Sequence, residues 1–379
     1  MQQTDIFDFL MDQYKITNPI RLIELFAGIG SQAKALKRIG VDFEHYKVVE
    51  FDKYAIKSYN AIHGTSFETS DITKIHAEDL EIKDTNKFTY LLTYSFPCQD
   101  LSLAGKGKGM QKGSGTRSGL LWEVERILNE CEELPQVLLM ENVPQVHGEK
   151  NIDHFKEWVL FLETKGYSNH WQDLNAKDYG IPQNRNRCFM ISILGDYKYE
   201  FPQPFELKLS LKDMIEDKVD EKYYLTDEQI DLIVNSNYMQ NKRRIQCKAY
   251  SDTLCARYYK DPKCVEVQDD KILIPEATKK GYAEAKDGDG IYINRPHQKR
   301  GCVQKGMIQT LKTSANDIGV VTKGSMIRKL TPLEYYRLMG FDDSDFHKAE
   351  LLNSNTQLYK QAGNSIVVNV LEAIFKQLF

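Results

Sequence analysis

IRLIELFAGIGSQAKALKRIG spans residues 20–40 and contains, in order, an apolar run, a glycine-rich turn and a helical pattern. The apolar run at 20–26 predicts a buried strand, and SQAKALKRIG predicts a helix that stops at Gly40. Gly28, Gly30 and Ala33 form a GxGxxA pattern, whose glycines let the backbone approach a ligand closely. Taken alone, this turn fits a cofactor cradle and a purely structural tight turn about equally well.

The same alternation continues along the chain and predicts the fold class. Strand-like runs recur at 46–50, 89–94, 136–140 and 188–193, with helical patterns at 119–131 and 152–165 between them. Strands that alternate with helices indicate an α/β fold, a mostly parallel sheet covered on both faces. The alternation predicts one large α/β domain over residues 1–200.

A different pattern follows the proline-containing stretch near residue 200. Residues 201–325 have weak periodicity and short strand-like pieces such as 271–274, which indicates a smaller, irregular, β-containing domain. Regular patterns return at 326–379, where Thr331 to Glu334 form a capping box with proline at the first helical position. We expect 326–379 to return to the first domain, with Asn364 and Ser365 at the start of the last helix.

Composition limits the class of protein. The 379 residues are 41% hydrophobic and 27% charged, with a net charge of −4. No apolar run is long enough to span a membrane, and the first residues lack the features of a signal peptide. The sequence therefore predicts a soluble, cytoplasmic protein. Its basic clusters, at 105–108, 242–244 and 297–300, fit solvated loops or nucleic-acid contacts.

Seven cysteines occur at positions 98, 131, 188, 247, 255, 264 and 302. No two of them have CxxC spacing, so we expect free thiols and no metal site. Cys131 and Cys188 lie in apolar surroundings typical of a core. Only Cys98 has a loop context that suits chemistry.

Two acids strengthen the cofactor interpretation of the glycine turn. Glu50 ends the second predicted strand, where a carboxylate can bind both ribose hydroxyls of an adenosine. Asp71 follows a further strand-like region and can accept a hydrogen bond from an adenine amino group. The three features in this order indicate an adenosine cofactor, and both NAD and S-adenosylmethionine fit them.

The turn SFPCQ at 95–99 places Cys98 just beyond a buried strand, where open α/β sheets carry their chemistry. Cys98 is either a nucleophile or a small buried side chain. Residues 99–119 form a glycine-rich, basic loop, and a loop this long inside a domain indicates a lid that closes over a polyanion.

Further charged groups lie at the end of another strand and beyond it. Glu141 ends an apolar strand, where burial would raise its pKa and keep it protonated. Arg185 and Arg187 are two apart and share one face if extended. They can pair with phosphate, a base edge or buried carboxylates.

These motifs in this order, FAGIG, SFPCQ, ENV, QNRNR, RKLTPLEYYRLMGF and QAGNSIVV, resemble the bacterial and phage DNA cytosine-5 methyltransferase family. The resemblance covers residues 20–195 and 326–379. It implies a Rossmann-like S-adenosylmethionine-dependent methyltransferase domain, with a target-recognition domain at 201–325. The stretch TRSGLLWEVERIL at 116–128 also resembles the branch that includes CpG-specific enzymes.

The resemblance also implies the site residues and the chemistry. The Cys98 thiolate adds to C6 of a flipped-out cytosine, Glu141 holds N3, Arg185 lies near O2 and orients the ring, and Arg187 completes the catalytic set. Loop residues Gln99, Ser102 and Arg117 would touch DNA. S-adenosylmethionine would be bound by the following residues of the matching motifs, with no metal: Phe26, Ala27, Gly28, Ile29, Gly30, Glu50, Phe51, Asp71, Ile72, Pro97, Asn364, Ser365 and Val367.

The implied partner is double-stranded DNA in the nucleoid, with a restriction endonuclease as a genetic partner and a monomer as the acting unit. Three other classes compete with this interpretation. An RNA cytosine-5 methyltransferase shares the Cys98 and ENV motifs but has a shorter recognition region. A non-catalytic DNA-binding relative would have lost Cys98 or Glu141, and both are present. A nicotinamide-dependent dehydrogenase accounts for only the first motif.

Overall fold

The computed structural model describes residues 12–101, 109–234, 271–295 and 298–379. Its central sheet has the strand order β3-β2-β4-β5-β8-β6. The first four strands are parallel, and β8 is antiparallel to both its neighbours, so the predicted mostly parallel sheet is confirmed. Along the sheet, the strands are β3 (Phe43–Val49), β2 (Ile20–Leu25), β4 (Thr89–Tyr94), β5 (Val137–Asn142), β8 (Asn186–Leu194) and β6 (Tyr167–Asn175).

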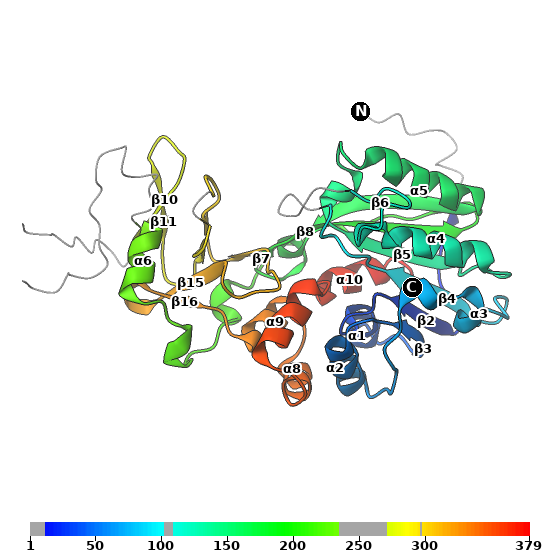
Figure 1. The fold of residues 1–379 in the computed structure, drawn as a ribbon, viewed down its shortest axis with the longest axis horizontal. Helices are drawn as coiled ribbons and strands as arrows, with labels where there is room; N and C mark the ends of the chain where they lie inside the picture. The colour runs from blue at the N-terminus through cyan, green and yellow to red at the C-terminus, as the bar shows by residue number, and fades with distance from the viewer. Residues whose placement is uncertain (1–11, 102–108, 235–270, 296–297) are drawn as a thin grey trace, which may run out of the picture.

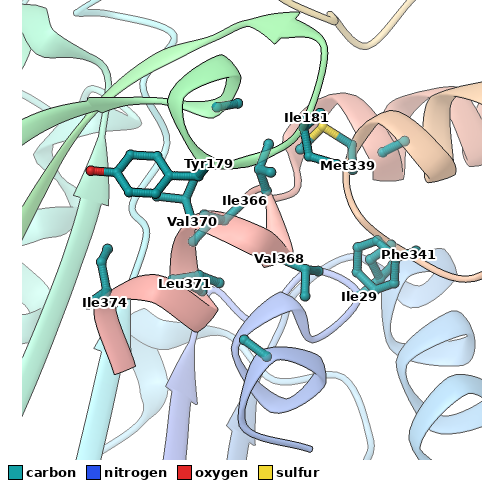
Figure 2. Packing of buried hydrophobic residues seen from close by; sticks show 14 of the residues in the cluster. Ile29, Tyr179, Ile181, Met339, Phe341, Ile366, Val368, Val370, Leu371 and Ile374 are labelled. Carbon is teal, nitrogen blue, oxygen red and sulfur yellow. The ribbon is translucent and has the colours of Figure 1, made fainter. Parts of the chain in front are cut away.

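Helices cover both faces of this sheet, and its strands are therefore buried on both sides. Successive residues point to opposite faces, so Leu22 joins one hydrophobic cluster and Ile23 the other. Helices α1 (Ser31–Arg38) and α10 (Val368–Phe375) pack on the first face, and α4 (Leu121–Glu130) and α5 (Ile152–Thr164) on the second. Figure 2 shows α10 from close by, with Ile366, Val368 and Leu371 in the cluster that also contains Ile29.

The remaining helices of the larger part flank the sheet or follow the smaller part in sequence. They are α2 (Lys53–His63), α3 (Ala77–Leu80), α7 (Pro332–Leu338), α8 (Asp343–Glu350) and α9 (Asn355–Asn364). The short strands β1 (Asp12–Gln13) and β9 (Tyr197–Lys198) pair in parallel. The Thr331 capping box begins α7 as the sequence predicts. No helix within the described ranges combines the length and apolarity that a membrane span requires.

The smaller part is mainly β-structure and lies at the opposite end of the molecule from β6 and α5 (Figure 1). It contains a four-stranded antiparallel sheet in the order β13-β12-β15-β16 and a β10–β11 hairpin. Its elements are α6 (Asp227–Val234), β10 (Ile272–Pro275), β11 (Tyr282–Ala285), β12 (Gly290–Tyr292), β13 (Val303–Gln304), β15 (Ile318–Thr322) and β16 (Met326–Lys329).

The two parts share a hydrophobic core. Leu211, Ile308 and Val320 belong to the cluster that packs under α10, although all three lie within 201–325. Strand β14 (Ile308–Gln309) pairs in parallel with β7 (Gln183–Asn184). Strand β16 extends the smaller sheet to Lys329, so the predicted division after residue 325 falls between two paired strands. The region 201–325 is therefore fixed to the larger part by packing and backbone hydrogen bonds.

The start of the last helix differs from the prediction. Asn364 is the last residue of α9, Ser365 to Val367 are extended, and α10 begins at Val368. Arg185 donates from Nη2 to the carbonyl oxygens of Gly363 (3.1 Å) and Ser365 (2.8 Å). These bonds turn both carbonyl groups toward the guanidinium, so the helix ends here instead of beginning.

A buried ion pair holds the segment through which the chain returns from the smaller part to the larger part. Both carboxylate oxygens of Glu334 accept hydrogen bonds from the Arg328 guanidinium, at 2.7 and 2.9 Å. The two side chains are 0% and 1% exposed. The same carboxylate accepts from the backbone N–H groups of Thr331 and Glu216. Glu334 therefore joins β16, the start of α7 and the segment that enters the smaller part.

We expect Glu334→Gln to lower the free energy of unfolding by about 3 kcal/mol or more, because it leaves the buried Arg328 charge without its partner. Urea denaturation measures the change. The matched control is Asp343→Asn, which removes the more exposed Arg337–Asp343 pair and should cost less than about 1 kcal/mol. Equal effects of the two variants would contradict the role of Glu334.

Candidate active site

The turn that carries Cys98 is held from two neighbouring elements. Asn142, the last residue of β5, donates from Nδ2 to the carbonyl oxygen of Phe96 at 2.9 Å. Ser118 Oγ donates to the carbonyl oxygen of Pro97 at 2.6 Å. Because β4 and β5 are adjacent and parallel, their carboxyl ends meet at one edge of the sheet. The Pro97–Cys98 turn after β4 therefore lies next to the end of β5.

Glu141 and the two arginines come together at this edge. The Glu141 carboxylate is 8% exposed, and its Oε1 lies 3.2 Å from Nε of Arg187. Strand β8 supplies Arg187 because it runs antiparallel beside β5. Cys98 is close enough for Arg187, Glu141 and Arg185 each to change the pKa of its thiol. The structure thus brings all four predicted catalytic residues into one cluster.

The two arginines occupy different environments. Arg185 is buried and donates to three backbone carbonyl oxygens, those of Leu311, Gly363 and Ser365. Burial and the Arg187 charge lower the Arg185 pKa to about 9, so its guanidinium is still charged at neutral pH. Arg187 instead forms the ion pair with Glu141 and donates to its neighbouring carbonyl group. Arg185 is thus engaged with the backbone, whereas Arg187 faces the Glu141 carboxylate.

Burial sets the protonation of the thiol and the carboxyl group. It raises the pKa of Cys98, and the lowering effect of Arg187 is smaller, so the thiol is protonated at neutral pH. Arg187 and Arg185 therefore oppose the rise in the thiol pKa but do not outweigh burial in the free protein. Burial also raises the pKa of Glu141, against the opposing effects of Arg187 and Arg185, which is the predicted direction.

The glycine turn and Glu50 form a second cluster at the same edge of the sheet. Phe26, Gly28 and Gly30 all have positive φ angles, so the backbone turns sharply between β2 and α1. Gly28 N–H donates to Oε2 of Glu50 at 2.8 Å, and Asp52 N–H donates to Oε1 at 2.7 Å. Burial raises the Glu50 pKa, and these two bonds oppose that rise. The carboxylate is held in place before any ligand arrives.

The flanking residues are placed as an adenosine site requires. Phe51 follows Glu50 and is 78% exposed, which leaves its aromatic ring free to stack on a base. Asp71 caps a short 3₁₀ turn through Oδ1, which accepts from the backbone and side chain of Thr73. These bonds lower the pKa of Asp71 and keep it ionised. Ala27, Ile29 and Ile72 are buried behind these polar groups.

The end of α9 closes over the beginning of α2. Lys360 Nζ lies 2.6 Å from Asp52 Oδ2, and Gln361 Nε2 donates to the carbonyl oxygen of Tyr54. Asn364 is exposed, whereas Ser365 and Val367 are buried. Residues 364–367, which the sequence predicts to bind the cofactor, are therefore held near Glu50 by the preceding turn of α9, which contacts Asp52 and Tyr54.

The described ends of the glycine-rich loop are tied together. Arg117 Nη1 donates to Oε1 of Gln99 at 2.9 Å, and Asp100 Oδ2 accepts from the backbone N–H groups of Arg117 and Ser118. Gln99 is exposed beside Cys98. Ser102 and the basic residues at 105–108 and 242–244 lie outside the described residues, as does His297.

One further positioning group was not predicted. Arg126 Nη2 donates to the carbonyl oxygens of Ile72 (3.1 Å) and Ile75 (2.7 Å), so α4 holds the turn that carries Asp71. Glu123 and Glu130 accept from its other nitrogens. Arg126 lies in the stretch TRSGLLWEVERIL, which the sequence analysis singles out. A single arginine in a helical pattern does not reveal that its partners are the backbone carbonyl groups of a distant turn.

Comparisons with known proteins agree with this geometry. The family model described as C-5 cytosine-specific DNA methylase matches residues 20–379. The type II methyltransferase M2.ScrFI of Lactococcus lactis subsp. cremoris is 33% identical, over 95% of this chain and 99% of the relative. M.HhaI of Haemophilus parahaemolyticus, also a type II methyltransferase, is 30% identical over 94% and 93%. A solved methyltransferase of Entamoeba histolytica has the same fold, with a TM-score of 0.62 and 21% identity over 96% and 98%.

We expect alkylation of Cys98 by iodoacetamide to increase with pH up to a midpoint above the usual thiol range, because only the thiolate reacts. Peptide mass spectrometry at each pH isolates Cys98 from the other cysteines. Glu141→Gln should lower the midpoint by removing a nearby negative charge, and Arg187→Gln should raise it. A midpoint below the usual thiol range in the unmodified protein would contradict the conclusion that burial raises the Cys98 pKa.

We expect Arg126→Gln to weaken binding of S-adenosylhomocysteine about tenfold, or ~1.4 kcal/mol, because the Asp71 turn loses its two bonds to α4. Isothermal titration calorimetry measures the affinity. The control is Glu123→Gln, which leaves the Arg126 guanidinium on both carbonyl groups and should bind normally. Unchanged binding in a folded Arg126→Gln protein would show that α4 does not position this turn.

Proposed function

Because the chain belongs to the C-5 cytosine-specific DNA methylase family and is a DNA cytosine-5-methyltransferase, we propose that it works through covalent addition of Cys98 to a flipped-out cytosine. The methyl donor is S-adenosylmethionine, and the substrate is cytosine within a short specific sequence of double-stranded DNA. The observation that carries the proposal is the cluster of Cys98, Glu141 and Arg187 at the carboxyl ends of adjacent strands.

The second cluster fits S-adenosylmethionine. The fixed Glu50 carboxylate suits the two ribose hydroxyls, the exposed Phe51 ring suits one face of adenine, and Asp71 suits its amino group. When bound, S-adenosylmethionine supplies an electrophilic methyl group on a sulfonium. Its binding at the turn between β2 and α1 places the donor at the same edge of the sheet as Cys98.

Cys98 would make C5 of the cytosine reactive, because that carbon is a poor nucleophile while the ring is conjugated. The thiolate forms a bond to C6, and the displaced electron pair makes C5 nucleophilic while Glu141 donates its proton to N3. C5 takes the methyl group as the methyl–sulfonium bond breaks. A base then removes the C5 proton, and its electron pair expels the Cys98 thiolate from C6. N3 returns its proton to Glu141, which releases neutral 5-methylcytosine.

Arg187, rather than Arg185, is the better candidate for the contact to O2 of the ring. Both terminal nitrogens of Arg185 donate to backbone carbonyl groups, whereas Arg187 lies beside the carboxylate that would hold N3. N3 and O2 are neighbours on the cytosine edge, so adjacent donors suit them. Arg185 then acts through the backbone that it positions.

Substrate binding would activate the thiol. Glu141 in its ionised form raises the Cys98 pKa, and Arg187 lowers it. Once cytosine N3 holds the protonated form of Glu141, the first effect disappears and the second persists. Loss of the Glu141 negative charge therefore lowers the Cys98 pKa and favours the thiolate when the base is in place.

A cytosine stacked in a duplex cannot reach a buried thiol, so the base must leave the helix. Gln99 follows Cys98 in the sequence, and it accepts a hydrogen bond from Arg117 at the other end of the glycine-rich loop. We assign to them the DNA contacts nearest the extruded base, together with Ser102. The region 201–325 would read the flanking sequence.

The test is base-resolution methylation sequencing of DNA from a methylation-free bacterial host that expresses the chain. We expect 5-methylcytosine in one short sequence context and none with Cys98→Ala, which should still bind S-adenosylmethionine in a calorimetric titration. Unmodified DNA from cells with soluble, cofactor-binding protein would overturn the assignment to DNA and make RNA the substrate to examine. Equal loss of methylation and cofactor binding in Cys98→Ala would show that Cys98 is structural.

A further inference from the structure

Three side chains of metal-ligand type meet around Cys188 of β8, whose side chain points to the opposite face of the strand from that of its neighbour Arg187. They are His147, Asp173 and Cys188, and one potential ligand atom of each lies within 4.8 Å of the other two. His147 Nε2 lies 2.9 Å from Asp173 Oδ1. The chain separations are large, 26 residues between the first two, so no short sequence motif predicts the group.

Strand pairing sets this arrangement. Asp173 and Cys188 are direct partners across β6 and β8, and Asn142 is the partner of Cys188 across β5 and β8. His147 ends the 3₁₀ turn Pro144–His147, which begins two residues after β5. Strands β6 and β8 therefore define the positions of Asp173 and Cys188, and the 3₁₀ turn after β5 brings His147 to them.

The shape of the group is that of a shallow cup. Cys188 is 0% exposed and forms the floor, whereas the His147 and Asp173 side chains are 31% and 30% exposed and form the rim. The rim residues are open to solvent, and the sulfur lies beneath them. Burial, and after it the nearby carboxylates of Asp173 and Glu141, raise the pKa of the Cys188 thiol, so a metal ion must displace a bound proton.

We propose that His147, Asp173 and Cys188 form a binding site for a zinc-class divalent transition-metal ion. One imidazole nitrogen, one carboxylate oxygen and one sulfur are ligand types that zinc accepts, and water would complete a tetrahedron from the open side. Bond lengths of about 2.0–2.3 Å place tetrahedral ligand atoms roughly 3.3–3.8 Å apart. The three atoms lie within 4.8 Å of one another, and the 2.9 Å distance between His147 Nε2 and Asp173 Oδ1 would widen on binding. The thiol proton leaves to solvent as the sulfur–metal bond forms.

An ion bound by His147, Asp173 and Cys188 would link the segment that follows β5 to strands β6 and β8. Asn142 pairs with Cys188 and also donates to Phe96 before the Cys98 turn. The ion is therefore expected to stabilise the sheet edge that carries the candidate active site. Thiolate ligation also selects against hard cations such as Mg²⁺.

The test is a Co²⁺ titration of the full chain carrying Cys98→Ala, which removes the catalytic thiol as a ligand. We expect one equivalent to bind with a sulfur-to-cobalt charge-transfer band, which Zn²⁺ displaces and Mg²⁺ does not. Adding Cys188→Val should abolish the band, and adding His147→Gln should weaken binding by at least about 100-fold, because loss of an outer-shell partner alone costs ~10–100-fold.

The matched control adds Cys131→Val, which removes a free thiol outside the proposed site and should leave the band unchanged. Zn²⁺ should raise the unfolding temperature of the Cys98→Ala protein but not of Cys98→Ala with Cys188→Val, a readout independent of methyl transfer. The proposal is overturned if no stoichiometric band appears or if the band survives in Cys188→Val. His147 and Asp173 would then form an ordinary ion pair beside a core cysteine.

Discussion

The buried guanidinium of Arg185 holds together three segments that are distant in the sequence. It lies between β7 and β8 and donates to the carbonyl oxygens of Leu311, Gly363 and Ser365. Leu311 follows β14, and the other two residues lie at the end of α9. Gly363 has no side chain because a Cβ there would lie 2.3 Å from the Lys312 carbonyl oxygen. This junction sets how the region 201–325 and the C-terminal helices meet the central sheet.

Two kinds of site meet at one edge of that sheet because its strands are parallel. The turn after β2 and the end of β3 give the glycine turn and Glu50, whereas the ends of β4 and β5 give Cys98 and Glu141. The parallel strands thus bring the cluster around Glu50 and the cluster around Cys98 to the same edge of the sheet. Burial then keeps the thiol protonated, so the free protein carries little reactive thiolate despite two nearby arginines.

The central sheet was predictable because its strands are apolar runs separated by helical patterns, and the resemblance of six motifs supplied the candidate residues. Sequence spacing could not separate the roles of Arg185 and Arg187, because their difference depends on carbonyl groups more than 120 residues away. Sequence spacing also predicted that the last helix begins at Asn364, whereas the preceding helix, α9, ends at that residue. Arg126 and the His147–Asp173–Cys188 group escaped prediction for the same reason, since strand and helix packing assembles them.

The central claim is that Cys98 forms a bond to C6 of cytosine. The most direct measurement uses duplex DNA in which 5-fluorocytosine replaces cytosine, because fluorine cannot leave as a cation and the final elimination is blocked. With S-adenosylmethionine present, we expect a denaturant-stable protein–DNA complex whose modified peptide contains Cys98. An adduct on another residue would contradict the account. So would the absence of any adduct from a preparation that methylates ordinary DNA.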